Sequence, residues 1–176
     1  MNLKSLILIS GLILVSSFIA YYFLGGLNEV KYSIKPAQSY SIIGKEYSGK
    51  NNSLKLESIF DSTKELLDSR FSEGILVIVN DESQNDDDAN KVWYFIGIIT
   101  MSPIGQLPKG YEIREFASKK IIRAKIESHN LVMPKPEKVR RKAIGFAKSE
   151  GLEVSEFTIE KYLGEGVIEI DFLVKE

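Results

Sequence analysis

Polar and apolar residues alternate along 155–174, the last part of the chain, and this period of two predicts a pair of strands. Two glycines lie in the middle segment 163–166, where a tight hairpin turn needs the positive φ that glycine adopts without strain. In the first strand, Thr158, Glu160 and Tyr162 share one face. A carboxylate beside an aromatic ring in mid-sheet indicates either a solvated outer face or the floor of a pocket.

The rest of the chain divides into elements by its hydrophobic periodicity. Apolar residues three and four positions apart predict a helix at about 53–70, with Ser53 as its N-cap, and another over 134–150, with Gly151 as its C-cap. Gly44 interrupts one strand pattern and marks an expected bulge or close approach of two backbones. The predicted strands of this part lie at 30–34, 39–47, 75–80, 92–100, 111–116 and 119–127.

These elements follow the order strand, helix, strand, strand twice, with a spacing of about 80 residues. Ile42 and Ile122 occupy equivalent strand positions, and Phe60 of the first helix falls on Arg140 of the second. Few residues are identical between the halves, so the order of the elements carries the argument for a repeat.

Two such units predict an α+β domain in which each helix covers the sheet from the same side. We expect duplicated β-α-β-β units at about 30–100 and 111–175, an antiparallel sheet of about eight strands, and two helices on one face. A groove would follow the pseudo-twofold axis between the units. Small ligands usually bind in grooves of this kind.

The segment 5–24 contains twenty residues without a charge and ends in the aromatic positions 21–23. A helix of that length covers about 30 Å, the thickness of the hydrocarbon core of a bilayer, and aromatic residues favour its interface. We therefore expect residues 1–26 to form a single transmembrane anchor with a short linker, and 27–176 to form the ligand-binding domain. The alternative is a cleaved signal peptide, which the length of the run and the lack of a small-x-small cleavage site disfavour.

The orientation of this segment follows only weakly from its flanking charges. Lys4 precedes it, whereas Lys31 and Lys35 follow it, so the positive-inside count is nearly balanced. A very short N-terminal tail is commonest in signal anchors that translocate the following domain. The expected localisation is a single-pass membrane protein with an extracytoplasmic domain.

Composition removes several classes of function. The net charge is −1, without the basic stripe of a nucleic-acid binder, and the lack of cysteine excludes disulfides, thiolate metal sites and thiol catalysis. The acidic segment 81–88 lacks the mid-loop glycine and spaced ligands of a calcium-binding EF-hand, which favours a solvated loop. His129, the only histidine, makes no zinc site without cysteines. The basic positions 140–142 predict a solvent-exposed helix face, or weak attraction to anionic lipid headgroups. We expect no metal, no cofactor and no nucleic-acid partner.

Two short motifs resemble the GyrI-like small-molecule-binding domains, which also serve as effector domains of multidrug-sensing transcription regulators and are distant relatives of the SOUL haem-binding proteins. That family has a strand ending Glu-x-Tyr before its last turn, here EKY at 160–162, and an aromatic strand ending in glycine, here WYFIG at 93–97. The resemblance covers about 30–175. One N-terminal span followed by this domain is similar to the testis-expressed, membrane-anchored branch of the family. The chain departs from the family at 128–134, where many members carry a glycine and a tyrosine before the second helix.

The resemblance implies that Glu160 lies at the floor of a pocket. A poorly solvated carboxylate there would attract lipophilic cations, on which aromatic side chains would stack. Ordinary core packing is the alternative for each of these aromatic residues. The candidates for the pocket walls are Tyr162, Trp93 and Tyr94, and more weakly Tyr40 and Tyr47.

Three functions follow from this interpretation. The favoured one is a membrane-anchored, non-catalytic domain that binds a hydrophobic small molecule, which can be cationic, in the groove between the halves. The second is a hydrolase of reactive electrophiles with Glu160 as general base. The third is a membrane-proximal adaptor that binds another protein and in which the groove is vestigial.

Overall fold

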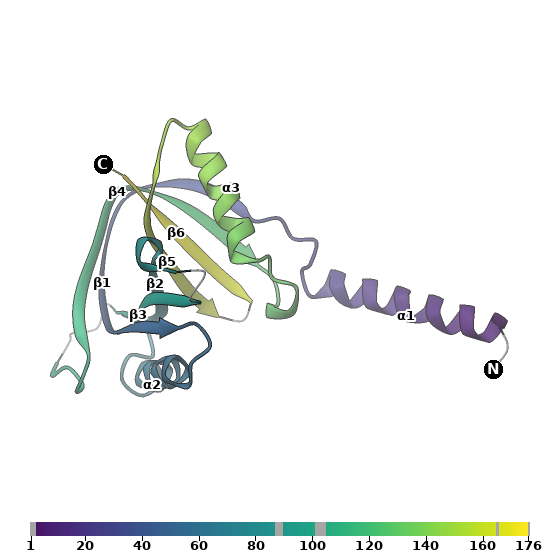
Figure 1. Cartoon of the computed structure of the whole chain (residues 1–176), viewed down its shortest axis with the longest axis horizontal. Coiled ribbons are helices and arrows are strands. Elements are labelled where there is room, and N and C mark those ends of the chain that lie inside the picture. Colours follow the sequence, from purple (N-terminus) through teal and green to yellow (C-terminus); the bar gives the residue numbers. More distant parts are fainter. Residues whose placement is uncertain (1–2, 87–89, 101–104, 165, 176) are drawn as a thin grey trace.

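The chain has an α+β fold, seen in a computed structural model that describes residues 3–86, 90–100, 105–164 and 166–175 (Figure 1). Two single-turn 3₁₀ helices, η1 (Glu82–Gln84) and η2 (Asn130–Val132), lie in connections. The α-helices are α1 (Leu3–Phe23), α2 (Leu54–Arg70) and α3 (Pro136–Ser149), and the strands are β1 (Lys31–Lys50), β2 (Ile75–Asp81), β3 (Lys91–Ile99), β4 (Glu112–Glu127), β5 (Val154–Gly164) and β6 (Val167–Val174).

The strands form a closed antiparallel barrel in the order β1-β3-β2-β5-β6-β4. The described residues thus contain six strands, and the prediction of about eight was wrong, because two pairs of predicted strands are each one long strand. The predicted strands at 30–34 and 39–47 are both part of β1, which passes through Pro36 without a break. Proline is tolerated there because β3 pairs with β1 only from Ile42 onward, so the missing N–H costs no ladder bond on that edge.

The register of the strands contains the same period of 80 residues as the sequence. Gln38 pairs with Ser118 where β1 meets β4, and Val79 pairs with Ile159 where β2 meets β5. In each of these pairs the two residues are themselves 80 positions apart. A twofold axis that exchanges positions 80 apart requires one pair of this kind at each junction between the halves. The β1-β3-β2 half and the β5-β6-β4 half therefore meet with pseudo-twofold symmetry.

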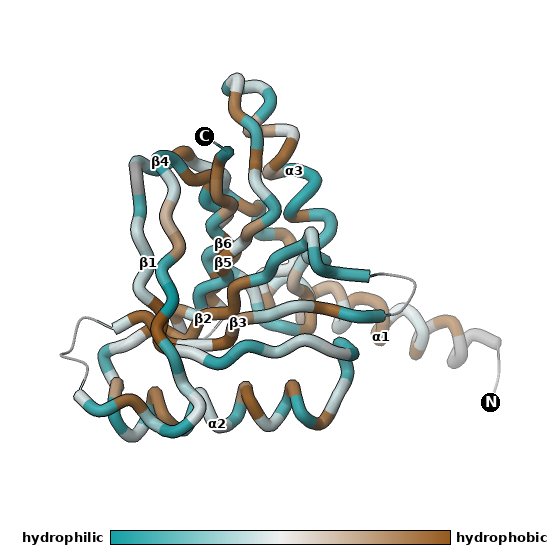
Figure 2. The backbone as a smooth tube through the Cα atoms, turned by 60° about the vertical axis from the view of Figure 1, so that its left-hand side comes forward, coloured by the Kyte–Doolittle hydropathy of each residue, from teal (hydrophilic) through white to brown (hydrophobic). Residues whose placement is uncertain are grey.

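Both helices after α1 pack on the outer face of the barrel, as expected. Val139, Ala143 and Ala147 of α3 cover the outward apolar residues of β4 and β6, and Leu66 of α2 packs on Ile43 and its neighbours. Hydrophobic and hydrophilic positions alternate along α2 and α3, as expected for helices with one buried face (Figure 2). A second apolar layer fills the interior of the barrel. The inner cluster comprises Tyr40, Ile42, Val77, Val79, Trp93, Phe95, Ile121, Ile159 and Leu173.

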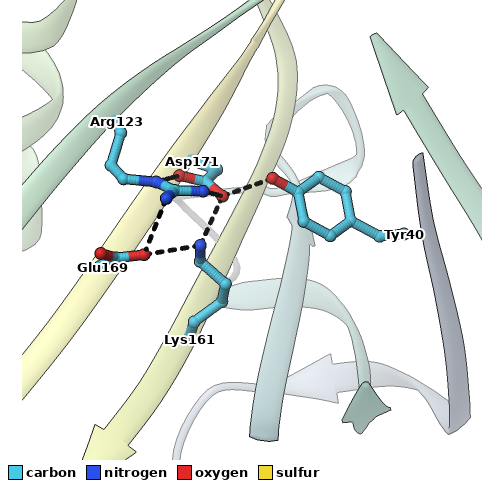
Figure 3. Close-up of polar contacts among 5 residues, drawn as sticks. All are labelled: Tyr40, Arg123, Lys161, Glu169 and Asp171. Atoms are coloured by element: carbon cyan, nitrogen blue, oxygen red, sulfur yellow. Dashed lines mark hydrogen bonds and ion pairs between the residues drawn. The ribbon is translucent and has the colours of Figure 1, made fainter. Parts of the chain in front are cut away.

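The interior also holds a group of charged side chains (Figure 3). Asp171, whose side chain is fully buried, accepts hydrogen bonds from Arg123, Tyr40 and Lys161, at 2.5 to 2.9 Å. Glu169 adds a second carboxylate, 2.7 Å from Lys161 and 3.3 Å from Arg123. Two cations thus balance two anions, and the phenol of Tyr40 completes the shell of Asp171. Sequence alternation placed Lys161 and Asp171 opposite Glu160 and Ile170 but did not show that their face points inward.

The C-terminal hairpin forms as predicted. β5 and β6 are joined by a turn in which Gly164 has φ +132° and Gly166 has φ +71°. These values lie where a side chain would strain the backbone. Helix α2 begins after Ser53, whose hydroxyl accepts from the Leu56 amide as the predicted N-cap, and α3 begins at Pro136, two residues later than predicted.

Helix α1 extends away from the barrel, and its apolar side chains between positions 12 and 19 are exposed (Figure 1). Two hydrogen bonds hold the end of this segment to the domain: the His129 amide donates to the Leu24 carbonyl at 2.9 Å, and the Asn28 side-chain Nδ2 donates to the Glu127 carbonyl at 2.6 Å. Within the described part of the chain, no helix is both long enough and apolar enough to cross a bilayer.

Candidate functional site

A cavity of about 480 Å³ opens on the outer face of the barrel, between α2 and the start of α3. Its floor is formed by neighbouring side chains of β2, β3 and β5, since Ile78 pairs with both Ile96 and Glu160. The first turn of α2 and the segment before it form one wall. The lining residues are Asn51, Asn52, Ser53, Leu56, Glu57, Phe60, Ile78, Tyr94, Ile96, Pro136, Glu160 and Tyr162.

Glu160 is the carboxylate at the floor of this cavity. Burial raises its pKa above the ordinary value, although a hydrogen bond from the Tyr162 hydroxyl to Oε2, at 3.3 Å, acts in the opposite direction. Within the described residues, no lysine or arginine forms an ion pair with this carboxylate. An anion that is shielded from water and lacks a basic partner is costly to keep ionised, and a cation in the cavity would offset that cost.

Aromatic rings surround this carboxylate. Tyr162 meets Phe60 of α2 edge to face, with the ring centroids 6.2 Å apart. Tyr94 of β3 lies close enough that burial, and then the negative charge of Glu160, raise the pKa of its phenol. The Tyr94 hydroxyl also donates to Asn51 at 3.3 Å. Three rings and one carboxylate around an apolar space are the groups that bind organic cations in proteins.

The structure brings three of the six candidate site residues together, since Glu160, Tyr162 and Tyr94 line one cavity. Trp93 lies in the apolar cluster inside the barrel, because neighbouring residues of a strand point to opposite faces. Tyr47 pairs with Tyr94 across the strands, but its hydroxyl is 2.5 Å from that of Ser53, so it supports the N-cap of α2 from beneath. Tyr40, which with Tyr47 was a weaker candidate, donates a hydrogen bond to Asp171 inside the barrel.

Sequence reasoning missed the aliphatic floor and the helix side of the cavity. Ile78, Ile96 and Phe60 fit ordinary core patterns, and nothing in their spacing marks them as lining residues. Phe60 belonged to the buried stripe predicted for α2. The 80-residue period aligned Phe60 with Arg140, and that alignment was the one sequence signal that pointed to corresponding places in the two halves.

A second cavity of about 550 Å³ adjoins the first and shares Asn51, Tyr94, Pro136 and Glu160 with it. It extends along β5 toward Thr158 and along α3 toward Arg140. Arg140 and Arg141 both line this cavity: Arg140 Nε is 2.6 Å from Glu82 Oε2, and Arg141 is exposed, as predicted for this basic segment. Glu160 stands at the junction of an aromatic end and a more polar end.

The remaining candidates have local partners. Asp81 does not lie in a solvated loop as predicted: it ends β2, is buried, and accepts hydrogen bonds from Ser83 and Gln84 as the N-cap of η1. The prediction for Asp87 and Asp88 lies outside the described residues. His129 Nδ1 accepts from the Leu131 amide at 3.3 Å, as the cap of η2. In the part of the chain that the structure covers, no three His, Asp or Glu side chains come close enough to hold a metal ion.

Comparison with known proteins shows which fold this is. No protein-family model matches the chain, and no curated protein matches it in sequence. Solved structures do match in shape. The EcmrR C-terminal domain aligns over 84% of this chain and 98% of its own length, with a TM-score of 0.59 at 10% identity. A second structure, of the EcmrR–DNA complex in EcmrR-RPo, aligns over 99% of this chain and 69% of its own length, with a TM-score of 0.61 at 12% identity.

A protein of Listeria innocua described as a hydrolase aligns over 82% of this chain and 92% of its own, with a TM-score of 0.54 at 10% identity. At these identities the likeness establishes the fold alone. The shared fold is consistent with the GyrI-like fold that the two sequence motifs suggested. The likeness to a membrane-anchored branch stays a prediction.

Proposed function

We propose that this protein binds a small, largely apolar organic cation in the cavity over Glu160, without transforming it chemically. The observation that carries the proposal is the Glu160 carboxylate itself, which is desolvated, lacks a basic partner in the described chain and is flanked by Phe60, Tyr94 and Tyr162. A cavity of about 480 Å³ also falls in the range of small-molecule sites. The likeness to the EcmrR C-terminal domain establishes the fold and does not identify a ligand.

Thermal-shift and calorimetric titration of the full chain in a mild nonionic detergent test this proposal. Butyltriphenylphosphonium serves as the cationic probe and triphenylphosphine oxide as a neutral molecule of similar shape. We expect the cation to raise Tm and the neutral compound to do so much less. In Glu160→Gln the preference for the cation should disappear, whereas Glu156→Gln, on the same strand but exposed, should keep it. Equal responses to both probes in the wild type would refute a role for Glu160.

Hydrolysis of a reactive electrophile is the second candidate, because a raised pKa suits Glu160 to accept a proton from water near neutral pH. Its expectation differs from that of a binding protein. Turnover of epoxide or lactone probes would be lost in Glu160→Gln while probe binding persisted. The absence of wild-type turnover with such probes would leave binding as the function.

A groove filled by the protein's own side chains would have favoured the adaptor alternative, but the cavity over Glu160 is open. We further propose that α1 attaches the domain to a lipid bilayer, with the domain on the extracytoplasmic side. The exposed, uncharged residues of α1 support this attachment. Membrane flotation should retain the wild-type chain and release the variant Leu12→Arg. Reporter fusions to the C-terminus test the orientation.

A further inference from the structure

The two ends of the groove occupy equivalent places in the two halves of the barrel. Ile78 pairs with Glu160, and Asn80 pairs with Thr158, so the exchange of positions 80 apart maps one pair onto the other. The same exchange places Asn80 on Glu160. The backbone that forms the floor of the groove therefore has the same arrangement on either side of the axis. The two ends of the groove differ in their side chains alone.

The side chains that face each other above this floor have diverged between the halves. Phe60 and Tyr162 make the edge-to-face aromatic contact at one end. The positions 80 residues away from them are Arg140 and Glu82, and these two make an ion pair at 2.6 Å. At one end of the groove the contact joins α2 to β5 and is aromatic, whereas at the other it joins α3 to the residue that follows β2 and is ionic.

Arg140 has more donors than this ion pair uses. Its Nη1 is buried and has no hydrogen-bond partner in the part of the chain that the structure describes. A buried guanidinium nitrogen without a partner costs more than a neutral donor in the same state, because it carries part of a full charge. Arg140 lines the second cavity, where its side chain is 24% exposed, and guanidinium groups bind oxyanions with two parallel hydrogen bonds, so an anionic group in this cavity would give the guanidinium a further partner.

We propose that the ligand is zwitterionic: an apolar cation bound over Glu160, joined to an oxyanion that binds Arg140. The inference rests on the proposed function and names the ligand class for the same groove. Both cavities include Glu160 and Pro136, so a single molecule can reach both ends. Thr158 and Glu160 lie on one face of β5, two residues or roughly 7 Å apart. Because Arg140 lines the same cavity as these two residues, the linker between the two charges should be a short chain of a few carbon atoms.

Two probes that differ in one charge test this inference. The first is (4-carboxybutyl)triphenylphosphonium, a zwitterion at pH 7.5, and the second is its methyl ester, which keeps the cation and the length but loses the anion. We expect the wild-type full chain, titrated calorimetrically in nonionic detergent, to bind the acid at least tenfold more tightly than the ester. A ratio of one or less would overturn the inference.

Substitutions of the two partners of the ion pair should change the ratio of the affinities for the acid and the ester in opposite directions. Arg140→Gln should reduce the ratio to about one and leave the affinity for the ester within about twofold. Glu82→Gln should raise the ratio, because Arg140 then no longer shares its charge with a competing carboxylate. Lys148→Gln removes a positive charge from an exposed site on the same helix and should leave the ratio unchanged. Far-ultraviolet circular dichroism checks that each variant is folded.

The outcomes separate the two proposals. Binding of the ester without preference for the acid would refute the zwitterion and leave cation binding intact. Failure of both probes to bind would refute the proposed function and, with it, this inference. A preference for the acid that persists in Arg140→Gln would refute the role of Arg140. An unchanged ratio in Glu82→Gln would contradict it as well, even if Arg140→Gln did not fold.

Discussion

The guanidinium of Arg123 donates two hydrogen bonds to the carboxylate of Asp171 inside the barrel, from Nε to Oδ1 at 2.7 Å and from Nη2 to Oδ2 at 2.9 Å (Figure 3). The two residues are directly opposed on β4 and β6. Burial alone would raise the pKa of Asp171, but hydrogen bonds from Arg123, Lys161 and Tyr40 hold it below its ordinary value. The pair therefore links two strands of the second half through a fully buried carboxylate and a guanidinium that is mostly buried.

Removal of the Asp171 carboxylate should strongly reduce the free energy of unfolding. Asp171→Asn leaves Arg123 and Lys161 with Glu169 as their only anion in the cluster, and a broken buried ion pair typically costs about 3–5 kcal/mol. Urea denaturation measures the loss. Glu153→Gln, which breaks an exposed ion pair with Lys175, should change little. Equal stability of the two variants would show that the buried cluster contributes nothing.

The same cluster gives a direction to the dependence of stability on pH. Because the pKa of Asp171 is lower in the folded state, its contribution is complete above its ordinary pKa of 3.8. It is lost as the pH falls through the lower, folded-state pKa, so the wild type should lose stability in acid below about pH 4. Asp171→Asn should show a flatter profile in that range. Denaturation midpoints between pH 2 and 6 measure both proteins.

Glu160 should show the opposite sign. Its pKa is raised in the folded state, so its contribution to stability is complete below the ordinary value of 4.5 and is lost as the pH rises through the folded-state pKa. Glu160→Gln should therefore stabilise the ligand-free protein at pH 7, by about 2–4 °C in Tm for each kcal/mol recovered. The affinity of the wild type for butyltriphenylphosphonium should rise over the same pH interval, above 4.5. A flat affinity profile would contradict an ionised Glu160 as the cation's partner.

Gly97 and Gly44 are paired across β3 and β1, where the two backbones approach closely. A Cβ on Gly97 would overlap the Ile43 carbonyl oxygen and lie 2.9 Å from the Gly44 Cα. Gly97→Ala should cost about 1–3 kcal/mol, the usual range for overpacking. Gly145, within α3, has no atom near its Cβ position, and Gly145→Ala should gain about 0.5–1 kcal/mol. Chemical denaturation of both variants should give opposite signs, and a shared sign would refute the steric argument.

The N-cap of α2 ties stability to the cavity wall. Ser53 accepts from the Leu56 amide at 3.1 Å and lies 2.5 Å from the Tyr47 hydroxyl, and it also lines the cavity. Ser53→Ala should cost about 1 kcal/mol, the typical value of an N-cap. It should also weaken binding of the cationic probe, because the first turn of α2 frays. Ser69→Ala, at the far end of the helix, should leave binding unchanged.

The order of helices and strands could be predicted from the chain because it depends on local patterns. The N-cap Ser53, the hairpin glycines and the 80-residue period are all legible in the sequence, and Gly151, predicted as the C-cap of α3, has a positive φ directly after the observed C-cap Glu150. The number of strands could not be predicted in the same way. Pro36 interrupts the alternating pattern in the sequence, but it does not end β1, because β3 pairs with β1 only from Ile42 onward. Closure of the barrel depends on pairing between β2 and β5 and between β1 and β4, and no local pattern encodes those pairs.

For the candidate site, the sequence by itself determined that Thr158, Glu160 and Tyr162 share a face, since alternation is a property of any strand. Only the tertiary structure decided that this face meets α2 and α3 and that Lys161 and Asp171 point into the barrel. The reason is that a period of two separates the faces of a strand without saying which of them is buried. The meeting of Phe60 with Tyr162 and of Arg140 with Glu82 likewise depends on residues far apart in the chain.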